Sequence, residues 1–103
     1  MERSERNPGD HAPVVGLAGD IDVANAASLG DVLCSNVDSF GAPVLIIDCT
    51  KVEFLEARAL AMMERVHEHG AARGTEIVWR GLARRHRNVI ELTGLDRLLL
   101  VAS

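Results

Sequence analysis

The side chains that could do chemistry in this chain gather around one stretch, "DCTKVEFLEARAL" (residues 48–60). It holds a thiol (Cys49), a hydroxyl (Thr50) and two opposite charges two positions apart (Glu56 and Arg58). Elsewhere the sequence contains no nucleophile and base at a spacing typical of a catalytic pair. An enzyme is therefore the least favoured class, and we expect neither catalytic residues nor a cofactor.

Histidine and cysteine could also bind a metal or form a redox pair. On an expected helix, His67 and His69 lie two positions apart, so their side chains diverge by about 200° and cannot share an ion. No metal site is predicted. Cys34 and Cys49 could form a reversible disulfide only if their Cα atoms come within about 7 Å. Buried, unreactive cysteines are commoner, so a redox role for this pair is a minor hypothesis.

Size and composition limit the function classes further. The chain has 103 residues, enough for one domain, and 48% of them are hydrophobic. A net charge of −4 and only three aromatic residues argue against a nucleic-acid partner. No apolar run reaches the roughly 20 residues of a membrane span, and the first residues do not resemble a signal peptide. We expect a flexible arm over residues 1–12, one domain over residues 13–103, a cytoplasmic location and no membrane insertion.

Hydrophobic periodicity predicts alternating strands and helices. Short apolar runs bounded by turn residues predict strands, and apolar positions repeating every three to four residues predict helices. Asp22 or Asn25 can cap the first helix. The run "VLIID" is continuous and apolar, which is typical of a central parallel strand. The strands are expected at 14–18, 44–48, 75–79 and 98–102, and the helices at about 26–40, 57–73 and 82–94. This order predicts an α/β fold with a mostly parallel sheet.

Three segments together resemble one family. They are "GDID", which opens a helix, "VLIIDCTKVEFLEARAL", which runs from strand into helix, and "RNVIELTGLDRLL", which precedes the last strand. In order and spacing they resemble a STAS domain, the fold of bacterial anti-sigma factor antagonists. The resemblance implies a mixed, mostly parallel sheet of four to five strands with about three helices. No clear closing C-terminal helix is present in this sequence.

The resemblance also implies a site at the junction between the second strand and the second helix. Anti-sigma factor antagonists carry a motif similar to Asp-Ser-Ser-Gly there, and a partner kinase phosphorylates the second serine. Aligning the apolar pair before the motif places Arg58 on the phospho-acceptor, so this chain is expected to be non-phosphorylatable. We expect the partner-binding surface to comprise Glu56, Ala57, Arg58, Ala61, Met62 and Arg65.

Three further polar residues, Asp22, Asp48 and Thr50, are predicted to lie in the switch loops around this junction. Thr50 could be an unusual phospho-acceptor, although threonine at a strand end more often hydrogen-bonds the backbone.

The resemblance implies a bacterial protein that regulates transcription through sigma factor control, by binding an anti-sigma factor of the kinase type or a related protein. An accessory subunit of a lipid-transport ATPase complex is the first alternative, because stand-alone STAS domains also occur there. A module that senses a nucleotide or another small molecule is the second, because "RGLARRHR" (80–87) is rich in arginine. A solvated helix face is the better explanation of that segment, because the sequence has no Gly-rich phosphate loop. The sequence leaves homodimer formation open.

Overall fold

The structure, a computed structural model, describes residues 12–102, so nearly all of the expected N-terminal arm lies outside the described residues. Strands and helices alternate along the chain, as the hydrophobic pattern predicted. The strands are β1 (Val14–Ile21), β2 (Val44–Leu55), β3 (Glu76–Arg80) and β4 (Leu100–Ala102), and the helices are α1 (Val23–Phe40), α2 (Leu60–Ala72) and α3 (Arg84–Thr93). Two short 3₁₀ turns, Ala57–Ala59 and Leu95–Arg97, precede α2 and β4.

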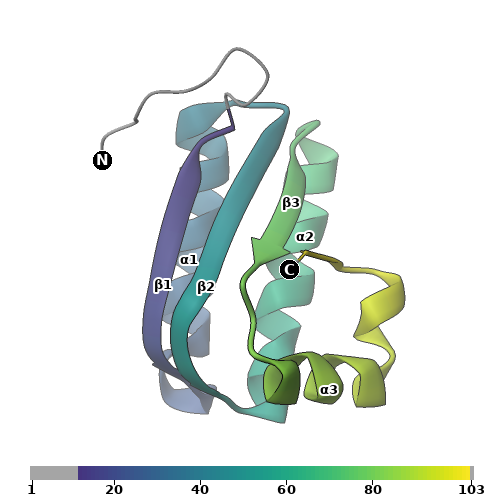
Figure 1. The fold of residues 1–103 in the computed structure, drawn as a ribbon. Helices are drawn as coiled ribbons and strands as arrows, with labels where there is room; N and C mark the ends of the chain where they lie inside the picture. Colours follow the sequence, from purple (N-terminus) through teal and green to yellow (C-terminus); the bar gives the residue numbers. More distant parts are fainter. Residues whose placement is uncertain (1–11, 103) are drawn as a thin grey trace.

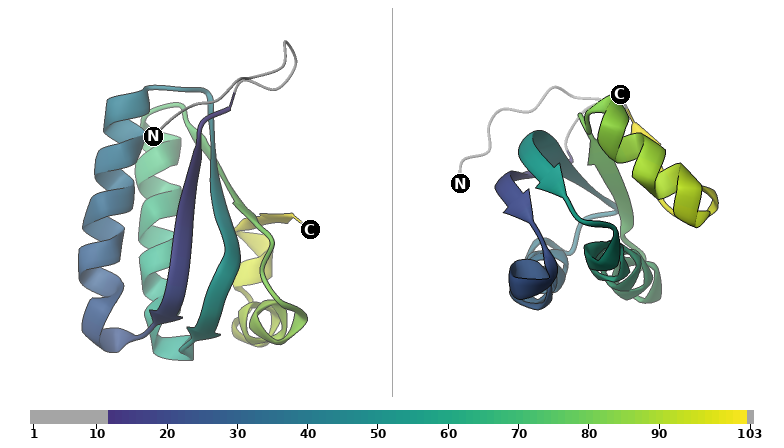
Figure 2. Two further views of the ribbon diagram at one scale, coloured as in Figure 1. Left: turned by 60° about the vertical axis from the view of Figure 1, so that its left-hand side comes forward. Right: turned by 90° about the horizontal axis from the view of Figure 1, so that it is seen from below.

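The described strands form one sheet in the order β1-β2-β3-β4, and every neighbouring pair is parallel. Helices α1 and α2 lie side by side on one face of this sheet, and α3 lies on the other side, near the β3–β4 edge (Figures 1 and 2). This confirms the predicted α/β fold with a mostly parallel four-stranded sheet and three helices. Because all of the strands run in the same direction, the carboxyl ends of β1 and β2 meet the starts of α1 and α2 at one end of the molecule (Figure 1).

The main core lies between the sheet and the pair α1 and α2. Leu33 and Val37 of α1 and Met63 and Val66 of α2 are fully or almost fully buried. They face the side of the sheet that carries the buried residues Leu45, Ile47, Ile77 and Trp79. Burial of large aliphatic side chains stabilises a fold by about 1.5–3 kcal/mol each, so this layer is what fixes the two helices on the sheet. No helix among residues 12–102 has the length and apolar character needed to cross a membrane.

Strand β2 is longer than predicted, and this corrects the placement of two residues. The strand continues to Leu55 because its second half pairs with β1 beyond a register shift that follows Gly16. Val52 and Leu55 are buried there, which stabilises the extension. Asp48 and Thr50 therefore lie within a strand, and their prediction as switch-loop residues is wrong. The sequence pattern was misread because the bulge breaks the period-two alternation.

The starts of α2 and β4 also differ from the prediction. The expected helix 57–73 begins as a 3₁₀ turn at Ala57–Ala59 and becomes α-helical only at Leu60. The expected strand 98–102 is reduced to Leu100–Ala102, because Leu95–Arg97 form a 3₁₀ turn first.

Helix α2 packs closely on β3 at Gly70. A Cβ atom at this position would lie 2.7 Å from the carbonyl oxygen of Thr75 and 2.9 Å from Cγ1 of Ile77. Since one of these neighbours is backbone, the contact cannot be relieved by a rotamer change alone. Gly70 thus sets how closely α2 approaches the sheet.

Helix α3 packs against the end of β2 through its first turn. The guanidinium of Arg85 donates a hydrogen bond to the carbonyl oxygen of Glu53 (3.0 Å). The neighbouring His86 is only 3% exposed, and neither of its ring nitrogens has a hydrogen-bond partner within the described residues. Burial, reinforced by the nearby charge of Arg85, lowers the pKa of His86, and a contact with the Glu53 backbone opposes the shift only in part.

The Gly70 contact predicts the effect of adding one methyl group. Gly70→Ala should lower the free energy of unfolding by about 1–3 kcal/mol, because overpacking outweighs the gain in helix propensity. Urea denaturation of the purified variant measures this change. A gain in stability, as alanine gives on an open helix face, would show that the close approach of α2 to β3 is wrong.

Burial of His86 predicts how stability depends on pH. In the unfolded chain His86 binds a proton below about pH 6.5, whereas in the folded chain its pKa is lower. Protonation therefore favours unfolding, and stability should fall as pH drops from 7 through 6.5, with a slope of up to about 1.4 kcal/mol per pH unit. Denaturation at several pH values between 7 and 5 should give a smaller slope for His86→Leu. Equal slopes for the two proteins would mean that His86 is not buried in its neutral form.

Candidate functional site

The junction at the carboxyl ends of β1 and β2 brings together residues that are far apart in the sequence. The backbone N–H of Glu56, directly after β2, donates to the carbonyl oxygen of Ile21 at the end of β1 (2.9 Å). Asp22 then caps α1, accepting a hydrogen bond from the N–H of Asn25 (3.1 Å) while the Asn25 side chain accepts one from the Asp22 N–H (3.0 Å). This reciprocal capping box fixes where α1 begins and satisfies two backbone donors.

The Glu56 carboxylate connects three segments at this junction. One oxygen, Oε1, accepts a hydrogen bond from the N–H of Val23, the first residue of α1 (3.1 Å). The other, Oε2, accepts from Nη2 (2.8 Å) and Nε (3.2 Å) of Arg58 in the 3₁₀ turn before α2. The Arg58 guanidinium and, secondarily, the Val23 N–H lower the pKa of Glu56. The carboxylate thus stays charged near neutral pH and offsets the cation that precedes α2.

A second ion pair joins α1 and α2 about two turns further along. Arg65 of α2 bonds the Asp31 carboxylate of α1. Its guanidinium crosses α1 over Gly30, where a Cβ atom would lie only 2.8 Å from Nη1 of Arg65. The bond to Asp31 raises the pKa of Arg65, so this group is a permanent cation.

Between these two ion pairs lies a shallow groove of about 290 Å³, here called the α1–α2 groove. Its walls and floor are mostly apolar and small, and an arginine stands at each end of its α2 side. The lining residues are Val23, Ala26, Ala27, Arg58, Ala59, Ala61, Met62 and Arg65. An open groove of this kind can accept the apolar face of another protein segment and leaves little room for an enclosed small molecule.

The structure brings the six residues of the predicted partner surface together. Arg58, Ala61, Met62 and Arg65 line the α1–α2 groove, Glu56 bonds Arg58, and Ala57 is exposed in the same 3₁₀ turn. Met62 is buried, however, so it forms the floor of the groove and is not an exposed contact.

Sequence reasoning missed the α1 side of the groove. Val23 is 51% exposed, and Ala27 is exposed beside it. Since α1 carries no charged residue between Val23 and Gly30, this side is neutral and apolar. Gly30 was the available signal, because a glycine inside a helical pattern often marks a close approach.

Asp22 caps α1 directly before Val23, at the edge of the groove, whereas Asp48 and Thr50 lie within β2, away from it. Asp48 accepts a hydrogen bond from the Thr50 N–H (3.0 Å), which is the main reason why its pKa is lowered. The Arg80 guanidinium lies 3.6 Å from the other Asp48 oxygen, on the neighbouring strand. These residues form a polar cluster on the sheet.

The two cysteines are free and buried. Burial raises the pKa of the Cys34 thiol, and it raises the pKa of Cys49 to about 12. Both groups are therefore poor sources of thiolate, and a redox role for them stays a prediction without chemical support here. Among residues 12–102, no three His, Cys, Asp or Glu side chains gather as a metal site would require.

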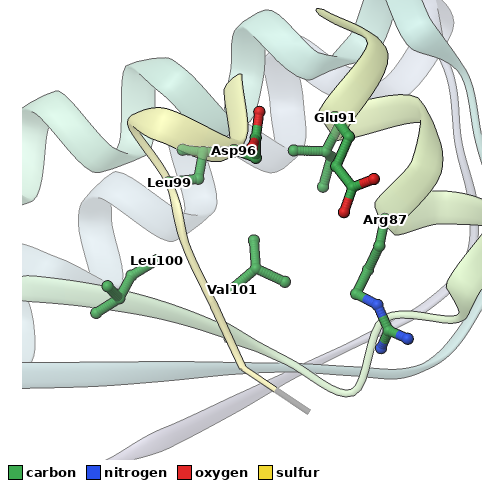
Figure 3. A pocket seen from close by; sticks show the side chains of 7 residues that line it. Arg87, Glu91, Asp96, Leu99, Leu100 and Val101 are labelled. Carbon is green, nitrogen blue, oxygen red and sulfur yellow. The ribbon is translucent and has the colours of Figure 1, made fainter. Parts of the chain in front are cut away.

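A second cavity, of about 360 Å³, lies between α3 and β4. Figure 3 shows Arg87 and Glu91 entering it from α3 and Leu100 and Val101 lining it from β4, with Asp96 above. Nη1 of Arg87 donates a hydrogen bond to the carbonyl oxygen of Leu82 (3.0 Å), so this nitrogen is already engaged by the protein. The carboxylates of Glu91 and Asp96 would repel a phosphate group, and the cavity therefore gives no support to nucleotide binding.

The family model described as "Mlab, STAS domain" matches residues 5–101. A comparison with curated proteins finds no match.

Solved structures that share the fold include the following three. An anti-sigma factor antagonist from Mycobacterium paratuberculosis is 33% identical, with a TM-score of 0.66 over 95% of this chain and 80% of that chain. The anti-sigma factor antagonist SpoIIAA in its unphosphorylated form is 13% identical, with a TM-score of 0.71 over 89% and 81%. The STAS domain of a SulP transporter from Vibrio cholerae is 20% identical, with a TM-score of 0.67 over 89% and 73%.

Proposed function

Because this chain belongs to the STAS domain family, we propose that it is a non-phosphorylatable, anti-sigma factor antagonist-like protein. It acts by binding a protein partner and catalyses no reaction. The partner is an anti-sigma factor of the kinase type or a related regulatory protein, and it docks at the junction that holds Glu56 and Arg58. The observation that carries this proposal is the Glu56–Arg58 ion pair held on the first N–H of α1.

Residue type supports the loss of phosphorylation. Arg58 occupies the position that aligns with the family's phospho-acceptor, and a guanidinium cannot accept a phosphate as a hydroxyl does. No serine, threonine or tyrosine lies between Lys51 and Gly74, the segment that includes the 3₁₀ turn and the whole of α2. Thr50, the nearest hydroxyl before the junction, lies within β2 beside Asp48, whose carboxylate bonds its N–H.

The charges of Glu56 and Arg58 support a docking surface that does not switch. A phosphate on serine adds about −1.5 to −2 charges, which is how such a site can switch docking off. Here Arg58 supplies a positive charge that no physiological pH removes. Glu56, whose pKa is lowered, supplies a negative charge that persists above its titration range. The junction therefore offers a partner the same charges at all times.

A second candidate has its own support, because one structural neighbour is the STAS domain of a SulP transporter. In this alternative the chain is an accessory subunit of a membrane transport complex, such as a lipid-transport ATPase. The docking surface would be the same, and the partner would differ. Co-purification of the tagged protein from its native cells separates the two: an anti-sigma factor supports the first candidate, and an ATPase subunit supports the second.

Restoring the hydroxyl tests the proposal for the junction. With a kinase-type anti-sigma factor from the same organism and ATP, the wild-type chain should bind and remain unmodified. Arg58→Ser should gain one phosphate per chain and then bind at least about tenfold more weakly, because the added charge repels the partner that installed it. Intact-mass spectrometry and calorimetric titration measure the two effects.

Ala57→Ser is the matched control, since it adds a hydroxyl at the neighbouring exposed position of the same turn. It should remain unmodified. Stoichiometric phosphate on Thr50 or on any serine of the wild-type chain would contradict the proposal, and so would absence of binding to every kinase-type anti-sigma factor of that organism.

A further inference from the structure

We infer that the α1–α2 groove binds an acidic, amphipathic helix of the partner, with carboxylates about two helical turns apart. This inference rests on the proposed function, because it names the chemistry of the segment that docks at the same junction. Small apolar residues form the middle of the groove, and Arg58 and Arg65 mark its two ends on the α2 side. An apolar side chain of the partner lies between the arginines, and a carboxylate bonds each of them.

The spacing of the two arginines sets the spacing of the carboxylates. Arg58 and Arg65 are seven positions apart, which is about 10–12 Å along a helix that begins with a 3₁₀ turn. Positions i and i+7 of a partner helix lie on one face at nearly the same separation. A helix lying along the groove can therefore place two acidic residues against the two arginines and an aliphatic residue at i+3 or i+4 between them.

Among residues 12–102, both arginines keep N–H groups that have no hydrogen-bond partner. A guanidinium has five N–H donors. Arg58 uses two of them on Glu56, and Arg65 uses one on Asp31. The Arg58 side chain is 78% exposed and that of Arg65 is 48% exposed. Each guanidinium can therefore donate hydrogen bonds to a second carboxylate without releasing the first.

The small side chains that line the groove favour a helix over a bulkier or more polar segment. Ala26, Ala27, Ala59 and Ala61 present only methyl groups, so a helix backbone can approach closely. The neutral first turns of α1 give the partner an apolar surface, with Val23 at its edge. A basic segment would have to compete with Arg58 and Arg65 for the Glu56 and Asp31 carboxylates, whereas an acidic segment can use the guanidinium N–H groups that have no partner among residues 12–102.

A synthetic peptide tests the inference. The probe is a helical peptide with glutamate at positions i and i+7 and leucine at i+3 and i+4, compared with a copy in which both glutamates are lysine. Titration into the isotopically labelled 103-residue protein, followed by amide NMR, should shift Ala26, Ala27, Ala59 and Ala61 with the glutamate peptide. The lysine peptide should bind at least tenfold more weakly, and added salt should reduce this difference.

Variants of the protein decide between groove binding and nonspecific attraction. The Arg58→Glu/Arg65→Glu double variant should lose at least tenfold affinity for the glutamate peptide and gain affinity for the lysine peptide. Ala61→Leu, at an exposed helical position, should block the groove and weaken binding at least tenfold without unfolding the chain. Arg84→Glu, an exposed arginine at the start of α3, is the matched control and should change nothing.

The inference is overturned if the glutamate peptide leaves the groove amides unshifted at millimolar concentration, or if Arg84→Glu weakens binding as much as the double variant. Its failure differs from failure of the proposed function. If an anti-sigma factor binds the wild type and the double variant with equal affinity, the proposed function stands, and the inference that the groove binds an acidic helix is wrong. If the peptide binds in the groove but no anti-sigma factor binds the protein, the inference about the groove stands, and the proposed function is wrong.

Discussion

One carboxylate connects the end of β2 to the starts of α1 and α2. Glu56 follows β2, bonds the first N–H of α1 through one oxygen and bonds Arg58 through the other. The positive end of the α1 dipole and the cation before α2 would otherwise repel each other across a short distance. Because Glu56 offsets both, Arg58 can stand at the start of α2 at little cost. The proposed docking surface, the α1–α2 groove and the fixed charge of the junction all depend on this contact.

Packing places the groove beside that carboxylate. Gly70 lets α2 lie close on β3, and Gly30 lets Arg65 cross α1 to reach Asp31. The two helices are therefore held side by side, and the groove between their first turns is lined mainly by alanine side chains with Val23 and Met62. In the proposed function this surface keeps both charges constant, whereas phosphorylation of a serine would change the charge of such a surface. A docking surface of constant charge suits a protein that is not switched by modification, so that its own abundance or the state of its partner would control how much complex forms.

The sequence predicted the fold well because its signals were local. Continuous apolar runs and helical periodicity predicted every described strand and helix, and Asp22, which caps α1, was one of the two residues considered for that role. The length of β2 was missed, because two register shifts between β1 and β2 leave the buried residues Val52 and Leu55 three positions apart and so break the period-two alternation of a strand. Of the candidate site, the α2 side could be predicted from helical spacing around Arg58. The contacts to Val23 and Asp31 join residues more than 30 positions apart, and no local pattern reports them.

The titration of a single carboxyl group tests this account most directly. NMR spectroscopy of the side-chain carboxyl carbon of Glu56, followed from pH 2 to 7, gives its pKa in the folded protein. The account predicts a value below that of an ordinary glutamate, because Arg58 and the Val23 N–H both favour the charged form. It also predicts a return toward the ordinary value in Arg58→Ala. An ordinary or raised pKa in the wild-type chain would contradict the account, since the junction would then lack the contact on which its fixed charge depends.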